Sequence, residues 1–545
     1  MKSKFKLDVW GYITIALLGA YAIFLLYPML NLLRRSVYGP DGVFTLGYFS
    51  KFFGKKYYFG TLLNSLKVTL CTTVTTLLLG APLAYFFTMY KIRGNGVLRI
   101  LIILSSMSAP FIGAYSWILL MGRSGVVTTF LKDTFNIQGI NIYGFVGILV
   151  VLTLQLYPLV FLYVSGALKN IDQSLMEASL NLGCSGVKRF FSLIIPLVMP
   201  TILASSLLVF MRALADFGAP MLIGEGYRTF PVLIYNEFMG EVSGDDGFAA
   251  AISIIAALIF MAQKHASNKL AFTMNALHPI EPKELKGVRG VLIHLYSYLV
   301  VGLSIVPQCY VIYTSFLKTE GLVFKDGYWL GSYRTAFSKM GSSIVNTFVI
   351  AGSALVVIIL MAVLIAYLAV RRRNAATNTM DLISMMPYII PGSVIGIAML
   401  ICFNRPPLII SGTFLIMIVA LVIRRLPYTI RSSVAILQQI PITIEEASIS
   451  LGTSKMKTFF AITIPMMANG IVSGAILSWV TMITELSTAI ILYTGKTKTL
   501  TVSIYTEVIR GNYGVAAALS TVLTSLTALS ILIFMRISKS KDITM

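Results

Sequence analysis

The sequence predicts an all-α integral membrane protein with two parallel six-helix repeats around a pseudo-twofold axis along the membrane normal. Hydrophobic residues make up 57% of the 545 residues and charged residues only 12%, which is too few charges to cover a soluble protein of this size. About twelve apolar segments are long enough to cross a bilayer. A polar stretch that separates two of these segments occurs again at the corresponding place in the second half.

The predicted spans each have about the 20 residues that a helix needs to cross ~30 Å of hydrocarbon. In the first half they cover residues 10–33, 61–89, 98–121, 143–168, 197–223 and 247–263. In the second half they cover residues 291–316, 343–370, 381–402, 408–430, 467–493 and 514–535. Their uninterrupted apolar runs lack the alternation of membrane strands, so helices are expected. The weakest candidates are 247–263, which is short, and 408–430, which carries Arg424 and Arg425 at its end.

The repeated polar stretch is the clearest sign of internal duplication. The first copy, EASLNLGCSGVKRFFSLIIP, covers 177–196, and the second, EASISLGTSKMKTFFAITIP, begins 269 residues later and covers 446–465. Both copies have Gly six residues after Glu, then basic residues, Phe-Phe and a Pro nineteen residues after Glu. The chain therefore reads as two homologous halves.

Basic residues indicate on which side of the membrane each loop lies. Most of the net charge of +22 lies at the ends of the apolar segments, and loops rich in Lys and Arg face the cytoplasm. This bias places both termini and both polar repeats in the cytoplasm, although the outer loop at 34–56 is also basic.

The domain organisation follows from the repeat. We expect a first half at 1–263 with its polar loop at 172–196, a linker at 264–290, and a second half at 291–545 with its polar loop at 441–465. Because each half has an even number of spans and both loops lie on one side, the repeats are parallel rather than inverted. A pathway along the axis between them is the natural consequence.

No enzyme site is evident in the sequence. The nucleotide-binding motif Gly-x-x-x-x-Gly-Lys-Ser/Thr is missing, so the chain cannot by itself cradle nucleotide phosphates. The three histidines lie in or beside the linker, and the four cysteines are scattered without paired spacing. We expect no catalytic residue, resident metal or cofactor on this chain.

The polar repeats resemble the cytoplasmic coupling loop of ATP-binding-cassette importer permeases. The resemblance lies in Glu-Ala, the Gly five residues after the Ala, and the following Pro. Six spans per half in one chain are similar to the fused, double-length permeases of the ferric-iron branch, whose relatives also carry thiamine, phosphonates, sugar phosphates and polyamines. The phrase Ala-Asp-Phe-Gly at 215–218 also resembles the iron branch. The third loop position departs from the usual Ala, being Ser179 and Ser448.

The resemblance implies a transport subunit in the bacterial inner membrane that works with other proteins. ATP and Mg²⁺ would be bound by a separate ATPase, a homodimer with one copy on each loop, and an extracytoplasmic solute-binding protein would deliver cargo. No nucleic-acid partner is implied. The residues that would contact the ATPase are Glu177, Ala178, Gly183, Glu446, Ala447 and Gly452.

The chemistry of the loop fits this role. A Glu near the start of a short helix complements the positive helix end and can pair with a partner's basic residue. The Gly can adopt the backbone conformation that ends one short helix. The alternative is an amphipathic loop at the lipid headgroups, with Lys188, Arg189, Lys455 and Lys457 facing phosphates. Two copies at matched spacing favour the coupling role.

Four polar residues near the ends of two spans are candidates for the translocation path: Arg212, Asp216, Thr481 and Glu485. Each acid lies twenty residues beyond its loop Pro, about 30 Å along a helix, which predicts a position near the outer mouth. The structural alternatives are an ion pair between Asp216 and Arg212, one turn away, and solvation of Glu485 at the outer interface.

Two carboxylates at the mouth would suit ferric iron, a hard cation that prefers oxygen ligands, and would repel an anionic phosphonate or sugar phosphate. A competing class is an ion-coupled secondary transporter with parallel repeats. Such a transporter would need charged residues near mid-membrane, whereas the acids here are expected near the outer ends.

Overall fold

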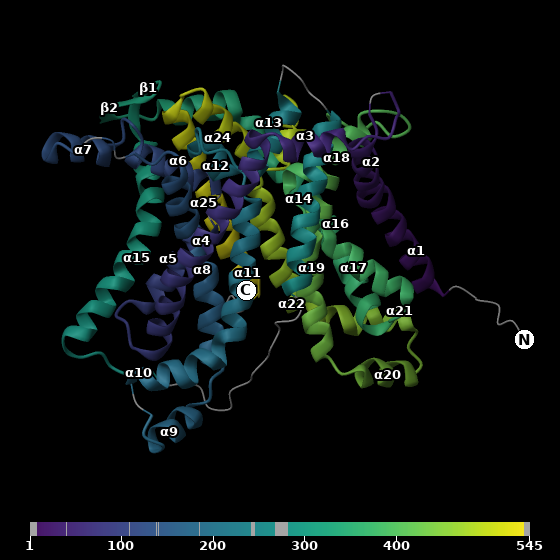
Figure 1. Ribbon diagram of the computed structural model, residues 1–545. Coiled ribbons are helices and arrows are strands. Elements are labelled where there is room, and N and C mark those ends of the chain that lie inside the picture. The colour runs from purple at the N-terminus through teal and green to yellow at the C-terminus, as the bar shows by residue number, and fades with distance from the viewer. Residues whose placement is uncertain are drawn as a thin grey trace, which may run out of the picture.

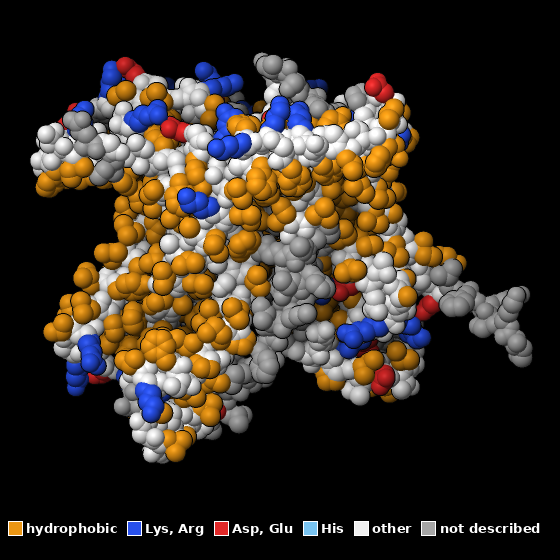
Figure 2. Space-filling view, viewed as in Figure 1, with side chains coloured by type: hydrophobic (Ala, Val, Ile, Leu, Met, Phe, Trp, Pro, Cys, Tyr) orange, Lys and Arg blue, Asp and Glu red, His pale blue; other side chains and the backbone are white. Residues whose placement is uncertain are grey.

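The computed structural model describes residues 8–39, 41–107, 110–137, 139, 141–184, 186–240, 246–267 and 282–538. Most of these residues are helical (Figure 1). Hydrophobic side chains cover the middle of the molecule, and most of the Lys and Arg side chains in view lie above or below them (Figure 2). This banding is expected of a protein whose middle faces lipid.

Helices of the first half run in the order α1 (Val9–Tyr21), the π-helix η1 (Ala22–Leu26), α2 (Tyr27–Val37), α3 (Gly47–Gly54), α4 (Lys56–Met89), α5 (Asn95–Met107), α6 (Pro110–Met121), α7 (Val126–Phe135), α8 (Phe145–Lys169), α9 (Gln173–Asn181), α10 (Gly186–Arg189), the π-helix η2 (Phe190–Ile194), α11 (Ile195–Ala215), α12 (Gly218–Ile223), α13 (Phe230–Met239) and α14 (Asp246–Ser267).

The second half runs in the order α15 (Gly287–Thr314), β1 (Leu317–Glu320), β2 (Val323–Tyr328), α16 (Gly331–Arg371), α17 (Ala375–Ile389), α18 (Gly392–Phe403), α19 (Phe414–Gln439), α20 (Ile442–Ser450), α21 (Lys455–Thr458), the π-helix η3 (Phe459–Thr463), α22 (Ile464–Ile483), α23 (Ala489–Leu492), α24 (Leu500–Ile509) and α25 (Tyr513–Ser538). The antiparallel hairpin β1–β2 was not predicted.

Each of the twelve predicted spans overlaps one or more helices. Within the described residues, eight helical runs are long and apolar enough to cross a membrane: Val9–Val37, Lys56–Met89, Phe145–Lys169, Gly186–Ala215, Gly287–Thr314, Gly331–Arg371, Lys455–Ile483 and Tyr513–Phe534. The predicted spans 98–121 and 381–402 are each a pair of helices, bent by 102° and 108°. The two weakest candidates correspond to α14 and α19. The prediction of an all-α integral membrane fold is confirmed.

Three predicted boundaries are wrong in ways that affect the polar interior. The spans 197–223 and 467–493 are not continuous, because α11 ends at Ala215 and α22 ends at Ile483. Each is followed by a short separate helix, α12 or α23. The span predicted at 408–430 is shifted, since α19 runs on to Gln439 and Arg424 and Arg425 lie near its middle.

The two halves interlock rather than lying side by side. Trp10 of α1 packs on Tyr367 of α16 and Phe459 of η3, with ring centroids 4.5 and 5.1 Å apart. In the other direction, Tyr296 of α15 donates a hydrogen bond of 2.9 Å to the backbone oxygen of Leu79 in α4. The first span of each half therefore packs on the other half, as Figure 1 shows for α1 and α15.

The polar repeats lie at one end of the molecule. Helices α9 and α10 project from the same end as α20 and α21 (Figure 1), as expected for parallel repeats. Most of the predicted linker, residues 268–281, is outside the described residues. Its last part is bonded to the end of α4, where the amides of Lys91 and Lys283 donate to the oxygens of Lys283 and Met89, each at 2.9 Å.

Candidate functional site

The two polar repeats fold alike. In each, a nine-residue helix, α9 or α20, ends just before the repeated Gly, and a four-residue helix follows. Gly183 has φ +76° and Gly452 has φ +89°, a left-handed conformation that favours glycine. Both lie in open space, with no atom near an added Cβ. A larger residue here would therefore be resisted by backbone strain rather than by a clash.

The predicted partner contacts are exposed in both loops. Glu177, Ala178, Glu446 and Ala447 all lie on the surface. Glu177 accepts a hydrogen bond of 3.1 Å from the Gln173 side chain, one turn earlier in α9. These residues are free to meet a partner without rearrangement of the loop helices.

A leucine precedes the glycine in each loop, and the sequence analysis did not single it out. Leu182 is 84% exposed and Leu451, 269 positions later, is 87% exposed. An exposed large apolar side chain at the tip of a polar loop suggests contact with another protein. The signal was available in the sequence, since both repeats read Leu-Gly.

The second loop has an ion-pair anchor that has no counterpart in the first. Glu445 of α20 is 6% exposed, and its carboxylate accepts a hydrogen bond of 2.9 Å from Nε of Arg371, at the end of α16. Arg371 also donates to the Ile440 backbone oxygen at 2.7 Å. The equivalent position in the first loop is Met176, which is buried among apolar side chains.

A cavity of about 250 Å³ lies between the halves, bounded by α5, α6, α8, α11 and α12 of the first half and by α17, α19 and α22 of the second. Its polar lining residues are Ser106, Gln155, Arg212, Asp216, Tyr388, Arg424, Arg425, Tyr428, Thr481, Thr484, Glu485 and Ser487. All four predicted path residues are among them.

Equivalent positions of the two halves face this cavity together. The pairs Asp216 and Glu485, Arg212 and Thr481, and Gln155 and Arg424 are each 269 positions apart and all line it. Each acid also binds the backbone amide three residues later, Asp216 that of Ala219 and Glu485 that of Thr488, each at 3.0 Å. The breaks after α11 and α22 therefore share the same hydrogen bond between the acid and the backbone.

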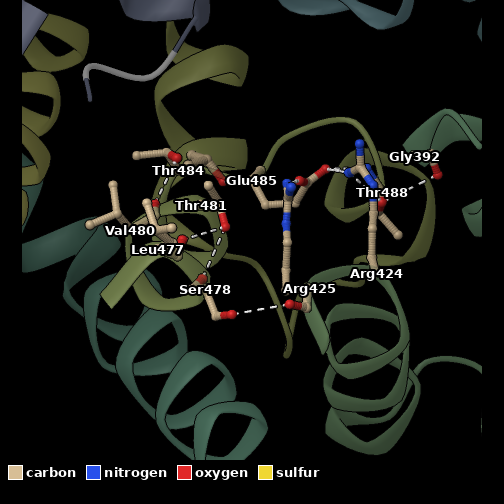
Figure 3. Close-up of polar contacts among 11 residues, drawn as sticks. Gly392, Arg424, Arg425, Leu477, Ser478, Val480, Thr481, Thr484, Glu485 and Thr488 are labelled. Atoms are coloured by element: carbon tan, nitrogen blue, oxygen red, sulfur yellow. Dashed lines mark hydrogen bonds and ion pairs between the residues drawn. The ribbon is translucent and has the colours of Figure 1, made fainter. Parts of the chain in front are cut away.

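Glu485 is not solvated at an outer interface, which corrects the sequence-based alternative. It is 5% exposed, and its two carboxylate oxygens accept hydrogen bonds from Arg424 and Arg425 of α19 (Figure 3). Arg424 also donates to Thr488 Oγ1 at 3.0 Å. The sequence analysis looked for a base one turn away on the same helix and missed these arginines, which belong to the preceding span.

The expected ion pair between Asp216 and Arg212 is not among those of the described residues. Asp216 accepts from the Ala219 amide instead. Arg212 is exposed to the cavity and lies beside the hydroxyl groups of Tyr388 and Tyr428. With three arginines and two acids lining the cavity, the premise of an acidic mouth that repels anions is wrong.

Within the described part of the chain, no group of three or more His, Cys, Asp and Glu side chains could hold a metal ion. The arrangement instead joins a polar cavity between two halves to a matched pair of exposed helical loops at one end. A polar cavity between two duplicated, membrane-spanning halves is an arrangement that suits a transport permease.

Sequence comparison identifies the family. The family described as binding-protein-dependent transport system inner membrane component matches twice, at residues 69–263 and 354–541. The chain belongs to this family, and the two matches confirm the fused, double-length architecture. It is a multi-pass inner-membrane permease of the binding-protein-dependent importer class.

The similar proteins include several ferric transport permeases. The chain is 29% identical to the ferric transport system permease protein FbpB of Actinobacillus pleuropneumoniae over 94% of this chain and 76% of that protein. It is 28% identical to a putative ferric transport system permease protein of Haemophilus influenzae over 87% of this chain and 76% of that protein. A putative 2-aminoethylphosphonate permease of Salmonella typhi is 24% identical over 43% of this chain and 82% of that protein.

Proposed function

We propose that this chain is the membrane-spanning subunit of an ATP-driven importer of ferric iron. The assignment of iron as the cargo rests on the similarity to two ferric transport permeases over 94% and 87% of the chain. Family membership removes the ion-coupled secondary transporter from consideration, because the family works with binding proteins.

The two polar loops are the proposed docking sites for a pair of ATPase subunits. Glu177, Ala178 and Gly183 on one loop, and Glu446, Ala447 and Gly452 on the other, would contact one ATPase copy each. Their exposure and matched geometry support this role. Leu182 and Leu451 add an apolar anchor to each contact, since buried apolar side chains at the centre of an interface contribute most to binding.

The remaining parts of the importer follow from this placement. ATP and Mg²⁺ are bound by the ATPase pair, and this chain carries no cofactor. Both termini and the linker at 264–290 lie in the cytoplasm with the loops. A solute-binding protein docks at the opposite end, which carries α7, the β1–β2 hairpin, α13 and α24 (Figure 1).

The cavity is the proposed part of the translocation path inside the membrane. Arg212, Asp216, Thr481 and Glu485 line it from both halves. The breaks after α11 and α22 place both acids at helix ends, where a small movement of the loop helices can be passed along α11 or α22 to the cavity. A rigid span leading from each coupling loop to the cavity supports coupling by this route.

A second candidate cargo is an anionic phosphonate or phosphate ester. Three arginines against two acids in the cavity favour an anion, and a putative 2-aminoethylphosphonate permease is among the similar proteins. Thiamine, polyamines and ferric iron are all cations and gain no support from this charge balance, so the iron assignment rests on the sequence similarity alone.

Uptake measurements distinguish the cargoes. Cells that express the chain with its ATPase and binding protein would be given radiolabelled ferric iron or a radiolabelled phosphonate. Iron uptake that is lost when the ATPase is inactivated supports the proposal. Uptake of the phosphonate alone would show that the iron assignment is wrong, and uptake that does not need the ATPase would exclude ATP-driven import.

A further inference from the structure

The central cavity carries more positive than negative charge. Arg212, Arg424 and Arg425 line it against Asp216 and Glu485, so the lining side chains have a formal charge of +1 when both acids are ionised. A charged side chain within a membrane-spanning region is energetically costly and is usually paired or functional. An excess cation in this place therefore requires an explanation.

Glu485 is the counter-ion of two arginines at once. One carboxylate oxygen accepts from Arg424 and the other from Arg425, and the same group also binds the Thr488 amide. Figure 3 shows both guanidinium groups directed at this single carboxylate. One negative charge is thus shared between two positive charges, which leaves one of them uncompensated.

Two arginines of the cavity keep a donor or a charge that the described residues do not satisfy. Nε of Arg425 is buried and makes no hydrogen bond within the part of the chain that the structure describes. Arg212 is exposed to the cavity beside the hydroxyl groups of Tyr388 and Tyr428. These hydroxyl groups can donate hydrogen bonds but do not balance its charge.

We propose that the cavity binds a small oxyanion of the phosphate class. Guanidinium groups bind phosphate through paired, charge-assisted hydrogen bonds, and the hydroxyl groups of Tyr388 and Tyr428 supply further donors. A volume of about 250 Å³ has room for such an anion with several waters, since one water takes about 30 Å³. Glu485 binds the same arginines and therefore competes with the anion.

Competition by Glu485 predicts the sign of a substitution. Removing its charge frees two arginines and raises the formal charge of the cavity from +1 to +2, so anion binding should strengthen. Removing Arg425 should weaken it. The proposal rests on the transport role of the cavity but not on the cargo, and binding can be measured without transport.

The test measures binding of radiolabelled inorganic phosphate to the purified full chain in nanodiscs of phosphatidylcholine, by equilibrium dialysis. Glu485→Gln should bind about ten-fold more tightly than the unaltered chain, and Arg425→Gln about ten-fold or more weakly. Arg431→Gln is the matched control. Arg431 belongs to the same helix but pairs with Asp381 at 2.8 Å outside the cavity, so its phosphate affinity should not change.

Arg425→Lys, which keeps the charge, serves if Arg425→Gln does not fold, and it should retain part of the affinity. Equal phosphate affinity in the Arg425 and Arg431 variants, or no gain with Glu485→Gln, would overturn the site. Loss of phosphate binding when the nanodiscs contain phosphatidylglycerol would make a lipid headgroup the occupant and would overturn a free anion. Neither outcome of the binding test decides the proposed function, which is tested separately by the measurement of iron uptake.

Discussion

Arg425 and Glu485 form a largely buried ion pair, although 60 positions separate them in the sequence. Arg425 comes from the middle of α19 and Glu485 from the break after α22. Together with Arg424 the pair joins the fourth and fifth spans of the second half. The equivalent position to Arg425 in the first half is Leu156, so this connection is found in one half alone.

Removing the Glu485 charge should destabilise the protein when no anion is present. Breaking one side of a buried ion pair leaves uncompensated charge and costs about 3–5 kcal/mol. We therefore expect Glu485→Gln to lower the melting temperature of the purified chain in phosphate-free buffer. Arg431→Gln should have little effect, because its pair with Asp381 is partly exposed and such pairs contribute about 0–1 kcal/mol. Equal melting temperatures for both variants would contradict this.

The features that the sequence predicted well are local or repeated. Apolar length alone located the spans, and the 269-residue repeat located the loops with their two left-handed glycines. The repeat also predicted that Asp216 and Glu485 occupy equivalent places, since a duplicated sequence keeps its local structure. These predictions needed no knowledge of which helix lies next to which.

The features that the sequence did not predict depend on packing between distant segments. Hydropathy ended the predicted span at residue 430, soon after Arg424 and Arg425, because a hydropathy sum does not include the charge compensation supplied by Glu485. The same limit hid the pair between Arg371 and Glu445, 74 positions apart. The sequence also did not predict that the halves interlock through α1 and α15, because the sequence of an apolar helix does not indicate which helices pack against it.

Replacing both loop glycines with a β-branched residue should uncouple the permease from its ATPase. Gly183→Val and Gly452→Val each force a β-branched side chain into a left-handed backbone, at a cost of about 1–3 kcal/mol. The end of α9 or α20 should change its direction while the spans remain intact. We expect uptake to fall strongly with unchanged membrane insertion.

The control for the glycine variants is Gly166→Val in the last turn of α8, a glycine with no positive φ and open space around it. It should leave uptake near normal. Normal uptake in the variant that carries both Gly183→Val and Gly452→Val would contradict the proposal that these loops couple the permease to its ATPase.

The exposed leucines at the loop tips should contribute apolar binding energy to the ATPase contact. Leu182→Asp with Leu451→Asp should release the ATPase during purification, because burying a full leucine side chain is worth about 1.5–3 kcal/mol and a buried unpaired carboxylate is disfavoured. Co-purification measures the effect. Phe130→Asp on α7, 58% exposed at the other end of the molecule (Figure 1), is the control and should retain the ATPase. Retention by the leucine variant would exclude these tips from the interface.

Two adjacent glutamates of α20 should give opposite results. Glu446 is exposed, and together with Glu177 it is proposed to pair with the ATPase, where a hydrogen bond to a charged group contributes about 1.5–3 kcal/mol. Reversing both charges, Glu177→Lys and Glu446→Lys, should release the ATPase without lowering the melting temperature of the isolated chain. Glu445 is buried against Arg371, so Glu445→Gln should lower that melting temperature.

The variants at Glu445 and Glu446 distinguish a residue that holds α20 in place from a residue that contacts the partner. Glu445→Gln leaves Arg371 with its bond to the Ile440 oxygen but without a counter-ion, so α20 should be held less firmly against α16. Hydrogen exchange of the α20 amides should then rise in Glu445→Gln and stay unchanged in the Glu177→Lys, Glu446→Lys variant. If the charge-reversed chain instead keeps its ATPase with normal ATP hydrolysis, the loops face lipid headgroups, and Lys188 and Lys455 serve as membrane anchors.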